Sequence, residues 1–318
     1  MPMNPRLLRP LAKGRTLYFN AAVDSDWNTL GNWWTDSGHT TQASALPTSS
    51  DSVVLSATCG TNGGSEPTVV NLTNSNNCDF GINVTVTGMA TFNYSHNFGT
   101  VTGNAMFNNN AINEYGAVSG NATFNDSSYN NSNGTVTGDA TFNDSSYNSN
   151  GTVTGDATFN DDSHNDGTVT LDATFNGSSY NNATVSGNAT FNDSAYNYGG
   201  TVTGNATFNN TSYNNDYGTI SGDATFNNTS RNIDGLVGGN ATFNNSSFNE
   251  SYATVTLDAT FNGSSYNDVY GTVQGNATFT DSSYNNGTVT GTATFTGSAC
   301  NDGGTAGTFV PNPPPTCP

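Results

Sequence analysis

A short motif returns along most of the chain, from about residue 84 to about residue 302. Its clearest copy runs from Gly134 to Tyr147 and reads Gly-Thr-Val-Thr-Gly-Asp-Ala-Thr-Phe-Asn-Asp-Ser-Ser-Tyr. The Ala-x-Phe core of the motif recurs every 15 to 18 residues. This period is typical of short-coil solenoids and is too short for helical repeats. The chain is therefore expected to build its core by stacking many small units.

Within one copy the apolar residues alternate with polar ones. Val136, Gly138, Ala140 and Phe142 fall on one side, and threonine or aspartate falls on the other. A period of two indicates a β-strand whose apolar side faces inward. The inward glycine also suits a bend between two short strands. After each phenylalanine the Asn-Asp-Ser-Ser segment has the composition of a turn.

A second bulky residue lies five positions after each phenylalanine. Stacked copies would align equal residues in ladders, and the sequence predicts that both aromatic series belong to the core, with asparagine and threonine ladders outside. The predicted core ladder consists of Phe124, Phe142, Phe159, Phe175, Phe191, Phe208, Phe226, Phe243 and Phe261, together with Tyr129, Tyr147, Tyr180, Tyr196 and Tyr213. Other residue types, among them His164 and Arg231, take the tyrosine position in some copies.

These patterns predict an all-β fold, a single-stranded parallel β-solenoid with short coils and a tryptophan-rich N-terminal cap. Thirteen coils at about 4.8 Å each would give a rod of roughly 60 Å. Leu171 and Leu257 replace the inward glycine and are expected to thicken the rod locally. A disordered segment and a β-sandwich are the alternatives, and the regular aromatic residues argue against disorder.

Four regions follow from changes in composition. Residues 1–15 form a basic arm, and residues 16–50 hold Trp27, Trp33 and Trp34, which are all the tryptophans of the chain. We expect these rings to cap the first coil. The more specific alternative is that they form an exposed aromatic platform that binds a surface glycan. Residues 51–302 form the solenoid, and residues 303–318 form a proline-rich tail or cap, because proline cannot continue a paired ladder.

The opening of the chain resembles repetitive β-solenoid surface and virion-fibre proteins, including phage fibres and adhesin-like solenoids. The resemblance covers residues 16 to about 55, with the order Trp-Asn-x-x-Gly-Asn-Trp and then Leu-Pro-x-x-x-Asp-x-Val-x-Leu. It implies a structural role in a fibre or appendage and brings no catalytic residues. The first fifteen residues lack an apolar stretch typical of a signal peptide, which shifts the expectation from a secreted adhesin toward a virion protein.

The four cysteines form two pairs by position, one near each end of the predicted rod. The disulfide candidates are Cys59 with Cys78 and Cys300 with Cys317. Two disulfides would staple the ends and imply an oxidising environment. Reduced, buried thiols are the alternative.

Charge limits the partners. The net charge of −19 argues against nucleic acid, because five lysine and arginine residues cannot follow a phosphate backbone. No apolar run reaches the length of a membrane span, so membrane insertion is not expected. Three histidines and scattered glutamates offer no clustered acid and base, so the sequence predicts a protein that is not an enzyme.

Two further binding hypotheses come from the outward residues. Asn/Asp rows such as Asp139, Asp156 and Asp172 raise weak calcium binding, although no calcium-roll motif is present and no cofactor is expected. Paired threonines such as Thr135 with Thr137 form an array similar to the flat threonine faces of ice-binding solenoids. Ordinary strand preference also explains threonine at these positions.

The sequence therefore predicts a non-catalytic structural rod of an extracellular fibre, virion appendage or self-assembling filament. Its place would be extracellular or on a virion surface, and its partners would be further copies joined head to tail, or other fibre subunits. The alternative is an ice-binding or adhesive surface protein that uses the threonine face or the tryptophan cap.

Overall fold

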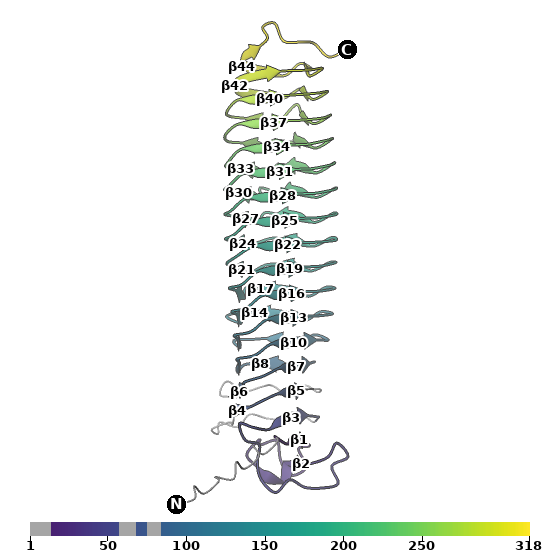
Figure 1. Ribbon diagram of the computed structural model, residues 1–318, viewed down its shortest axis with the longest axis vertical. Helices are drawn as coiled ribbons and strands as arrows, with labels where there is room; N and C mark the ends of the chain where they lie inside the picture. Colours follow the sequence, from purple (N-terminus) through teal and green to yellow (C-terminus); the bar gives the residue numbers. More distant parts are fainter. Residues whose placement is uncertain (1–13, 57–67, 75–83) are drawn as a thin grey trace, which may run out of the picture.

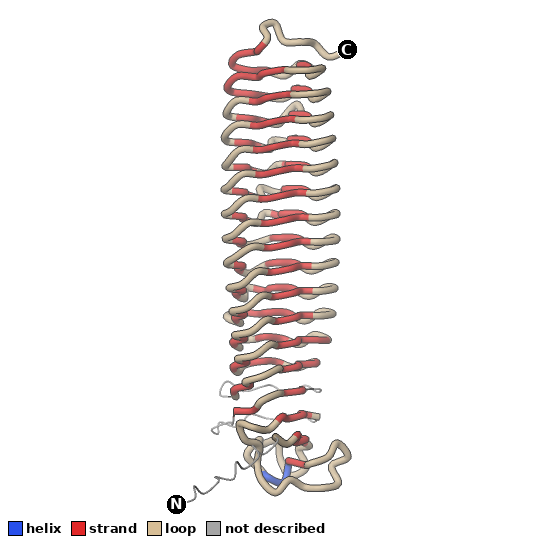
Figure 2. The backbone as a smooth tube through the Cα atoms, in the orientation of Figure 1, coloured by secondary structure: helices blue, strands red, loops and turns tan. Residues whose placement is uncertain are grey.

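The computed structural model describes residues 14–56, 68–74 and 84–318. The described chain forms a straight stack of flat coils, with β1 near one end of the rod and β44 at the other (Figure 1). Almost all regular structure is β-strand (Figure 2), and a short 3-10 helix, η1 (Leu30–Asn32), lies in the cap. No helix in these described ranges is long and apolar enough to span a membrane.

A typical coil contains three short strands. β15 (Thr135–Val136) lies on what we call the first face, β16 (Ala140–Phe142) on the second face, and β17 (Tyr147–Ser149) on the third face. The chain turns between Val136 and Ala140, and again between Phe142 and Tyr147. The coil is therefore closed by tight corners rather than by long loops.

The first face is built from two-residue strands before it merges with the second face near the C-terminal end. These strands are β4 (Thr68–Val69), β6 (Thr85–Val86), β9 (Thr100–Val101), β12 (Ala117–Val118), β15, β18 (Thr152–Val153), β21 (Thr168–Val169), β24 (Thr184–Val185), β27 (Thr201–Val202), β30 (Thr219–Ile220), β33 (Leu236–Val237), β36 (Thr254–Val255) and β39 (Thr272–Val273).

The second face carries the phenylalanines. Its strands are β1 (Thr16–Phe19), β3 (Ser52–Leu55), β5 (Leu72–Asn74), β7 (Ala90–Asn93), β10 (Ala105–Asn108), β13 (Ala122–Phe124), β16, β19 (Ala157–Phe159), β22 (Ala173–Phe175), β25 (Ala189–Phe191), β28 (Ala206–Phe208), β31 (Ala224–Phe226), β34 (Ala241–Phe243), β37 (Ala259–Phe261) and β40 (Ala277–Phe279). β42 (Thr288–Phe295) and β44 (Thr305–Val310) continue both faces.

The third face is a separate sheet of 13 strands. Its strands are β8 (His96–Asn97), β11 (Ile112–Asn113), β14 (Tyr129–Asn131), β17, β20 (His164–Asn165), β23 (Tyr180–Asn181), β26 (Tyr196–Tyr198), β29 (Tyr213–Asn215), β32 (Arg231–Ile233), β35 (Phe248–Glu250), β38 (Tyr266–Asn267), β41 (Tyr284–Asn285) and β43 (Cys300–Asn301).

Neighbouring coils pair in parallel and place equivalent residues opposite each other. Phe124, for example, is opposite Phe142, and Tyr129 is opposite Tyr147. The only register shift in the strand pairs of the described chain lies between β42 and β44, between Val289 and Thr292. The predicted parallel β-solenoid is therefore confirmed.

The core is a stack of phenylalanine rings beside valine and alanine. Phe142 is fully buried, and its ring centroid lies 4.7 Å from that of Phe124 and 4.8 Å from that of Phe159. The ring planes are nearly parallel, at 6° and 4°. Each buried ring contributes about 2 kcal/mol through burial, with additional stabilisation from stacking. The phenylalanines thus occupy the predicted core.

The corner between the first and second faces differs from the expectation. Gly138 lies at the bend rather than in the core, and a Cβ there would come within 2.6 Å of the Gly120 carbonyl oxygen in the preceding coil. Leu171 and Leu257 occupy the same corner, where their side chains point to solvent with exposures of 52% and 49%. They do not thicken the core, and that prediction was wrong.

The N-terminal cap covers the first coil. β1 pairs in parallel with β3, and β2 (Trp33–Trp34) pairs with β1 in the antiparallel sense. Trp33 is fully buried, with its ring 5.2 Å from Phe19 and 4.7 Å from Trp27. The predicted tryptophan-rich cap is present, and β1 already belongs to the strand stack.

An ion pair ties the cap to the first coil. Arg15 donates to both carboxylate oxygens of Asp51, and its Nε–Oδ1 distance is 3.1 Å. These bonds hold the pKa of the Asp51 carboxyl well below its ordinary value, against the opposing effect of burial. Residues 1–13 of the predicted arm, with their basic side chains, lie outside the described residues.

Candidate functional site

A continuous row of amide side chains fills the inner side of the third face. Asn165 donates through Nδ2 to Oδ1 of Asn181 at 2.8 Å, and Asn181 donates in the same way to Asn197 at 2.8 Å. The bonds run in one direction along the row formed by Asn97, Asn113, Asn130, Asn148, Asn165, Asn181, Asn197, Asn214, Asn232, Asn249, Asn267, Asn285 and Asn301. We call this row the inner amide ladder.

The predicted tyrosine ladder is on the opposite side of these strands. Tyr129 and Tyr147 stack with ring centroids 4.8 Å apart, but both side chains are half-buried at the surface. The core positions next to them belong to Ser128 and Asn130, which are fully buried. Tyr180, Tyr196 and Tyr213 lie on the same outer side. The placement of these tyrosines in the core, with asparagine outside, therefore requires correction.

A second amide row runs the other way along the corner that follows the phenylalanines. Asn143 donates through Nδ2 to Oδ1 of Asn125 at 2.8 Å, and Asn160 donates to Asn143 at 2.9 Å. These side chains are half-buried. The two rows point in opposite directions along the rod, so their dipoles oppose each other. Both rows provide side-chain hydrogen bonds between coils in addition to the backbone pairing.

The outward Asn/Asp row forms hydrogen bonds between successive coils. Asp139 accepts a hydrogen bond from the backbone N–H of Asp156 at 3.1 Å, and Asp156 accepts one from Asp172 at 3.1 Å. Each carboxylate thus satisfies the corner amide of the next coil. Within the described part of the chain, no group of three or more acidic, histidine or cysteine residues could hold a metal ion. Weak calcium binding stays a hypothesis.

The turn after each phenylalanine contains a residue in the left-handed region. Asp144 and Asp193 both have φ of 59°, and Gly177 has φ of 71° at the equivalent position. Asparagine, aspartate and glycine tolerate this conformation best. The recurring turn aspartates are explained by this backbone geometry.

The paired threonine rows do not lie on one flat surface. Thr135 is in a first-face strand, whereas Thr137 is exposed at the corner that follows it. A separate row of half-buried threonines lies along the second face, pairing without interruption from Thr123 to Thr294. The first-face row is also in register from Thr135 to Thr219, but it is interrupted at Leu236.

The tryptophans offer little surface for a sugar. Trp27 and Trp33 are buried, and the Trp33 Nε1 donates to the Trp27 carbonyl oxygen at 2.8 Å. Trp34 is half-buried, with its ring 6.1 Å from that of His39. The surface-glycan hypothesis at the cap therefore depends on Trp34 alone among the three.

A histidine–carboxylate pair of the type found in catalytic sites lies on the third face. The His164 Nε2 lies 3.3 Å from an Asp166 oxygen, and this hydrogen bond lowers the pKa of Asp166. The His164 ring, however, is stacked between Tyr147 and Tyr180, with centroids 4.8 Å from each. The arrangement extends the outer aromatic ladder and leaves neither ring face open.

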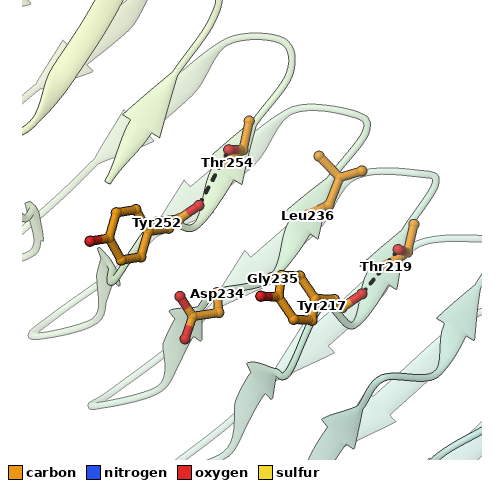
Figure 3. Close-up of a pocket in the computed structure, with 7 residues that line it drawn as sticks. All are labelled: Tyr217, Thr219, Asp234, Gly235, Leu236, Tyr252 and Thr254. Carbon is orange, nitrogen blue, oxygen red and sulfur yellow. Dashed lines mark hydrogen bonds between the residues drawn. The ribbon is translucent and has the colours of Figure 1, made fainter. Parts of the chain in front are cut away.

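A hollow on the described surface lies where the third face turns into the first. It is lined by Tyr217, Thr219, Asp234, Gly235, Leu236, Tyr252 and Thr254, and we call it the tyrosine notch. Figure 3 shows Tyr217 and Tyr252 projecting on the same side, with Asp234 between them.

The notch arises from a difference in loop length. Four residues separate Asn214 from Thr219 and Asn249 from Thr254, but only three separate Asn232 from Leu236. The middle coil therefore carries no tyrosine and leaves a gap. Asn232 donates to the Gly235 carbonyl oxygen at 3.3 Å and fixes this shorter corner. The sequence analysis did not predict the notch. The signal that could have identified it is the corner between Asn232 and Leu236, which is one residue shorter than the corners of the coils before and after it.

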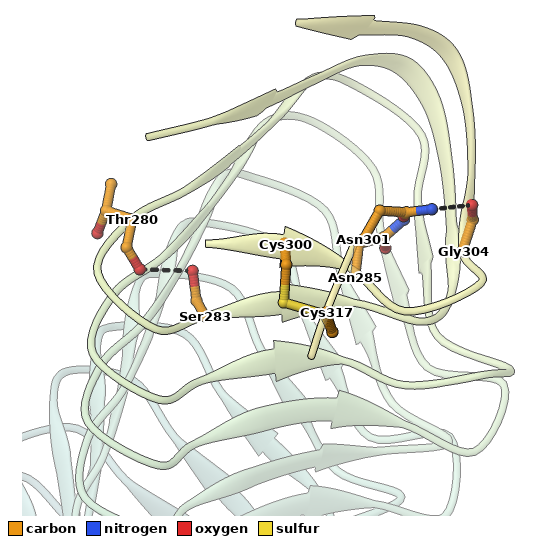
Figure 4. Close-up of a disulfide and its surroundings, with 7 residues drawn as sticks. All are labelled: Thr280, Ser283, Asn285, Cys300, Asn301, Gly304 and Cys317. Atoms are coloured by element: carbon orange, nitrogen blue, oxygen red, sulfur yellow. Dashed lines mark hydrogen bonds between the residues drawn. A yellow bond between two sulfur atoms is a disulfide. The ribbon is translucent and has the colours of Figure 1, made fainter. Parts of the chain in front are cut away.

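The C-terminal end carries a disulfide. Cys300 and Cys317 are bonded, with Cα atoms 5.1 Å apart, and the tail crosses the last strand of the third face (Figure 4). Asn301 donates through its backbone N–H to the Pro315 carbonyl oxygen at 2.7 Å. The predicted Cys300–Cys317 pair is present, whereas Cys59 and Cys78 lie outside the described residues. Strand pairing continues through β44, past the expected boundary at residue 302.

Comparison with known proteins gave no relative. No protein-family model, curated protein or solved structure matches the chain. The resemblance of the opening segment to fibre solenoids therefore has no support from a matching family, protein or structure.

Proposed function

We propose that the chain is a non-catalytic structural rod, one unit of an extracellular fibre, virion appendage or self-assembling filament. The observation that carries the proposal is the continuity of the ladders. From Asn97 to Asn301 every coil bonds to the next through its backbone and through the inner amide ladder. Each coil repeats the same contacts, so bending or opening at any one point breaks several bonds together.

The outer surface suits a spacer. Half-buried threonine, asparagine and stacked tyrosine cover the three faces, and charged residues make up 9% of the chain. The tight corners present few extended loops to proteases. A hydrated, stiff and protease-resistant rod is the property that such a surface supports.

The ends are where copies would join. The outer edge of β44 has the six residues Thr305–Val310, without charge or proline, and Val310 is 46% exposed. Uncharged strand edges of this kind readily accept another strand. At the other end, the cap presents β2, which pairs with β1 on one edge and bridges Gln42 through Trp34 on the other. Head-to-tail contact between these ends would bury both.

Electron microscopy of the purified chain tests the proposal, with a variant that lacks residues 1–13. The deletion stops before Arg15, because Arg15 anchors the cap through Asp51. We expect full-length rods to join end to end and to resist protease, and the deletion variant to join less. Particles that are flexible, or rods that remain single at every concentration and salt, count against the proposal.

A second candidate is ice binding through the straight threonine row on the second face. Its supporting observation is the unbroken pairing of threonines from Thr123 to Thr294. Thr207→Tyr, in mid-row, would then reduce thermal hysteresis, and Thr154→Tyr at the corner would not. If the wild-type chain neither shapes ice nor shows hysteresis, this candidate is excluded.

A further inference from the structure

We propose that the tyrosine notch binds a cationic side chain from residues 1–13 of the basic arm of a second copy joined end to end. The inference rests on the proposed function, because it requires two rods in line. The partner of the notch would be the arm, and the function of the arm would be to hold two copies together.

The spacing of the two tyrosines matches a cation. Thr219, Leu236 and Thr254 are opposite one another in successive coils, so Tyr217 and Tyr252 are two strand spacings apart, or about 9.6 Å. A cation midway would lie about 5 Å from each ring, within the roughly 6 Å over which cation–π attraction acts. The Tyr252 ring stacks on Tyr270 at 5.1 Å, which leaves its other side facing the notch. Asp234 supplies a carboxylate between the rings.

The two tyrosines occupy positions that their backbone disfavours. Tyr217 has φ of 64° and Tyr252 has φ of 58°; the equivalent corner positions hold Asn133, Asn150 and Gly199 in other coils, and Tyr115 in one distant coil. A bulky residue in this left-handed region costs roughly 1–2 kcal/mol. Both rings are also strongly exposed, at 81% and 74%, so burial does not offset this cost. Burial therefore does not account for tyrosine at these two positions, and the Tyr252 ring has only the stacking contact with Tyr270 to offset the cost.

Charge favours a cationic partner. Asp216, Asp234, Glu250 and Asp268 lie at this edge in four successive coils, and Arg231 is the one basic side chain beside them, 3.6 Å from Glu250. Of the five basic residues in the chain, Arg15 pairs with Asp51 and Arg231 with Glu250. The remaining three, Arg6, Arg9 and Lys13, are all in the arm.

The length of the arm shows whether the notch could bind the arm of its own copy or only that of a neighbouring copy. About twelve strand spacings, or roughly 57 Å, separate Arg15 from Leu236 in one rod. Arg6 is eight residues from Gly14, so it reaches at most about 29 Å from it. The arm cannot reach its own notch.

The neighbouring notch is closer. Four spacings separate β33 from β44 at the C-terminal end. One more for the joint and one for β2 of the next copy give about six spacings, or roughly 29 Å. A fully extended segment would therefore bring Arg6 level with the notch across a joint.

A labelled peptide with the sequence of residues 1–13 tests the inference. Its binding to the full-length chain would be followed by fluorescence anisotropy at low salt. Tyr217→Gly, Tyr252→Gly and Asp234→Asn should each weaken binding by about fivefold, the size expected for one cation–π or charge contact. The glycine variants also suit the left-handed backbone, so loss of binding would not reflect misfolding.

Tyr115→Gly is the matched control, since Tyr115 has φ of 59° and precedes a corner glycine in a distant coil. It should bind the peptide like the wild type. A peptide with Arg6, Arg9 and Lys13 changed to glutamine should not bind. The inference is overturned if the notch variants bind normally, if the glutamine peptide binds equally, or if a neutral sugar displaces the peptide.

Microscopy of the same variants separates this inference from the proposed function. Notch variants should still be rods, with end-to-end joints that open at lower salt than those of the wild type. Unchanged joints would overturn the contact between arm and notch and leave the structural rod in place. Peptide binding by wild-type rods that never join would instead overturn the fibre role and, with it, the in-line partner.

Discussion

Replacing one inner asparagine tests whether the amide ladder holds the coils together. Asn181 is fully buried in the middle of the rod. It accepts from Asn165 and donates both to Asn197 at 2.8 Å and to the Ala183 carbonyl oxygen at 3.1 Å. Asn181→Ala removes all three bonds while leaving the strand pairing intact.

The expected loss follows from the groups left behind. The Asn165 amide loses its acceptor, and the Asn197 oxygen loses its donor, and both residues are fully buried. A buried polar group without a partner costs about 1–3 kcal/mol. The two groups together predict a loss of about 4 kcal/mol in the free energy of unfolding, before any contribution from the small cavity.

Urea denaturation with the disulfide intact measures the loss, and hydrogen exchange in β20, β23 and β26 locates it. The control is Asn182→Ala, one residue along, where the exposed side chain donates to Asp166 at 3.0 Å. This surface change should cost less than about 0.5 kcal/mol. If Asn181→Ala costs no more than its control, water replaces the ladder freely, and the reasoning about its role is refuted.

Three further predictions concern the cap, the outer tyrosines and the tail. Because Arg15 lowers the pKa of Asp51, the pair's contribution to stability is full above about pH 4 and is lost as the pH falls below it; Asp51→Asn should remove this acid dependence in thermal melts. Burial first, then Tyr284, Asp268 and Glu250, raise the pKa of Tyr266 to about 12. Stability should therefore fall as the pH rises from about 10 through 12, and Tyr266→Phe should reduce that fall. Cys300→Ser opens a loop of 17 residues and should cost about 3 kcal/mol at the C-terminal end, seen as early cleavage of the tail with the rod intact.

The fold could be predicted because its main determinants are local and repeated. The alternation around Ala140 and Phe142 sets which side of the strand is apolar, and the period sets the stacking. The burial of Trp33 also followed from composition, since an open solenoid end needs a cover.

Alternation alone could not show which side chains of the third-face strands point into the core. Tyr147 and Asn148 are neighbours, so either could face inward, and bulk favoured the tyrosine. The left-handed residue Asp144 lies between Phe142 and this strand, and such a turn breaks the parity of the alternation. The repeat copies held the missing signal: asparagine takes the Asn148 position in thirteen coils, Asn148 included, whereas the tyrosine position also accepts His164 and Arg231.

The tyrosine notch depends on neighbours that one repeat cannot show. Tyr217 and Tyr252 are two coils apart, and the gap between them exists because the corner at Asp234 is one residue shorter. A pattern averaged over copies treats that deletion as ordinary loop variation. Only the stack reveals that it opens a space of the right width.

Electron microscopy of the full-length chain at low and high salt is the most direct test of the structural role. A joining rod should appear as thin filaments at low salt that separate into single rods when salt screens the contacts of the arm. Each rod should be about 77 Å long between β1 and β44, from sixteen strand spacings of about 4.8 Å. Compact particles, or single rods at every salt concentration, would contradict a role in a fibre.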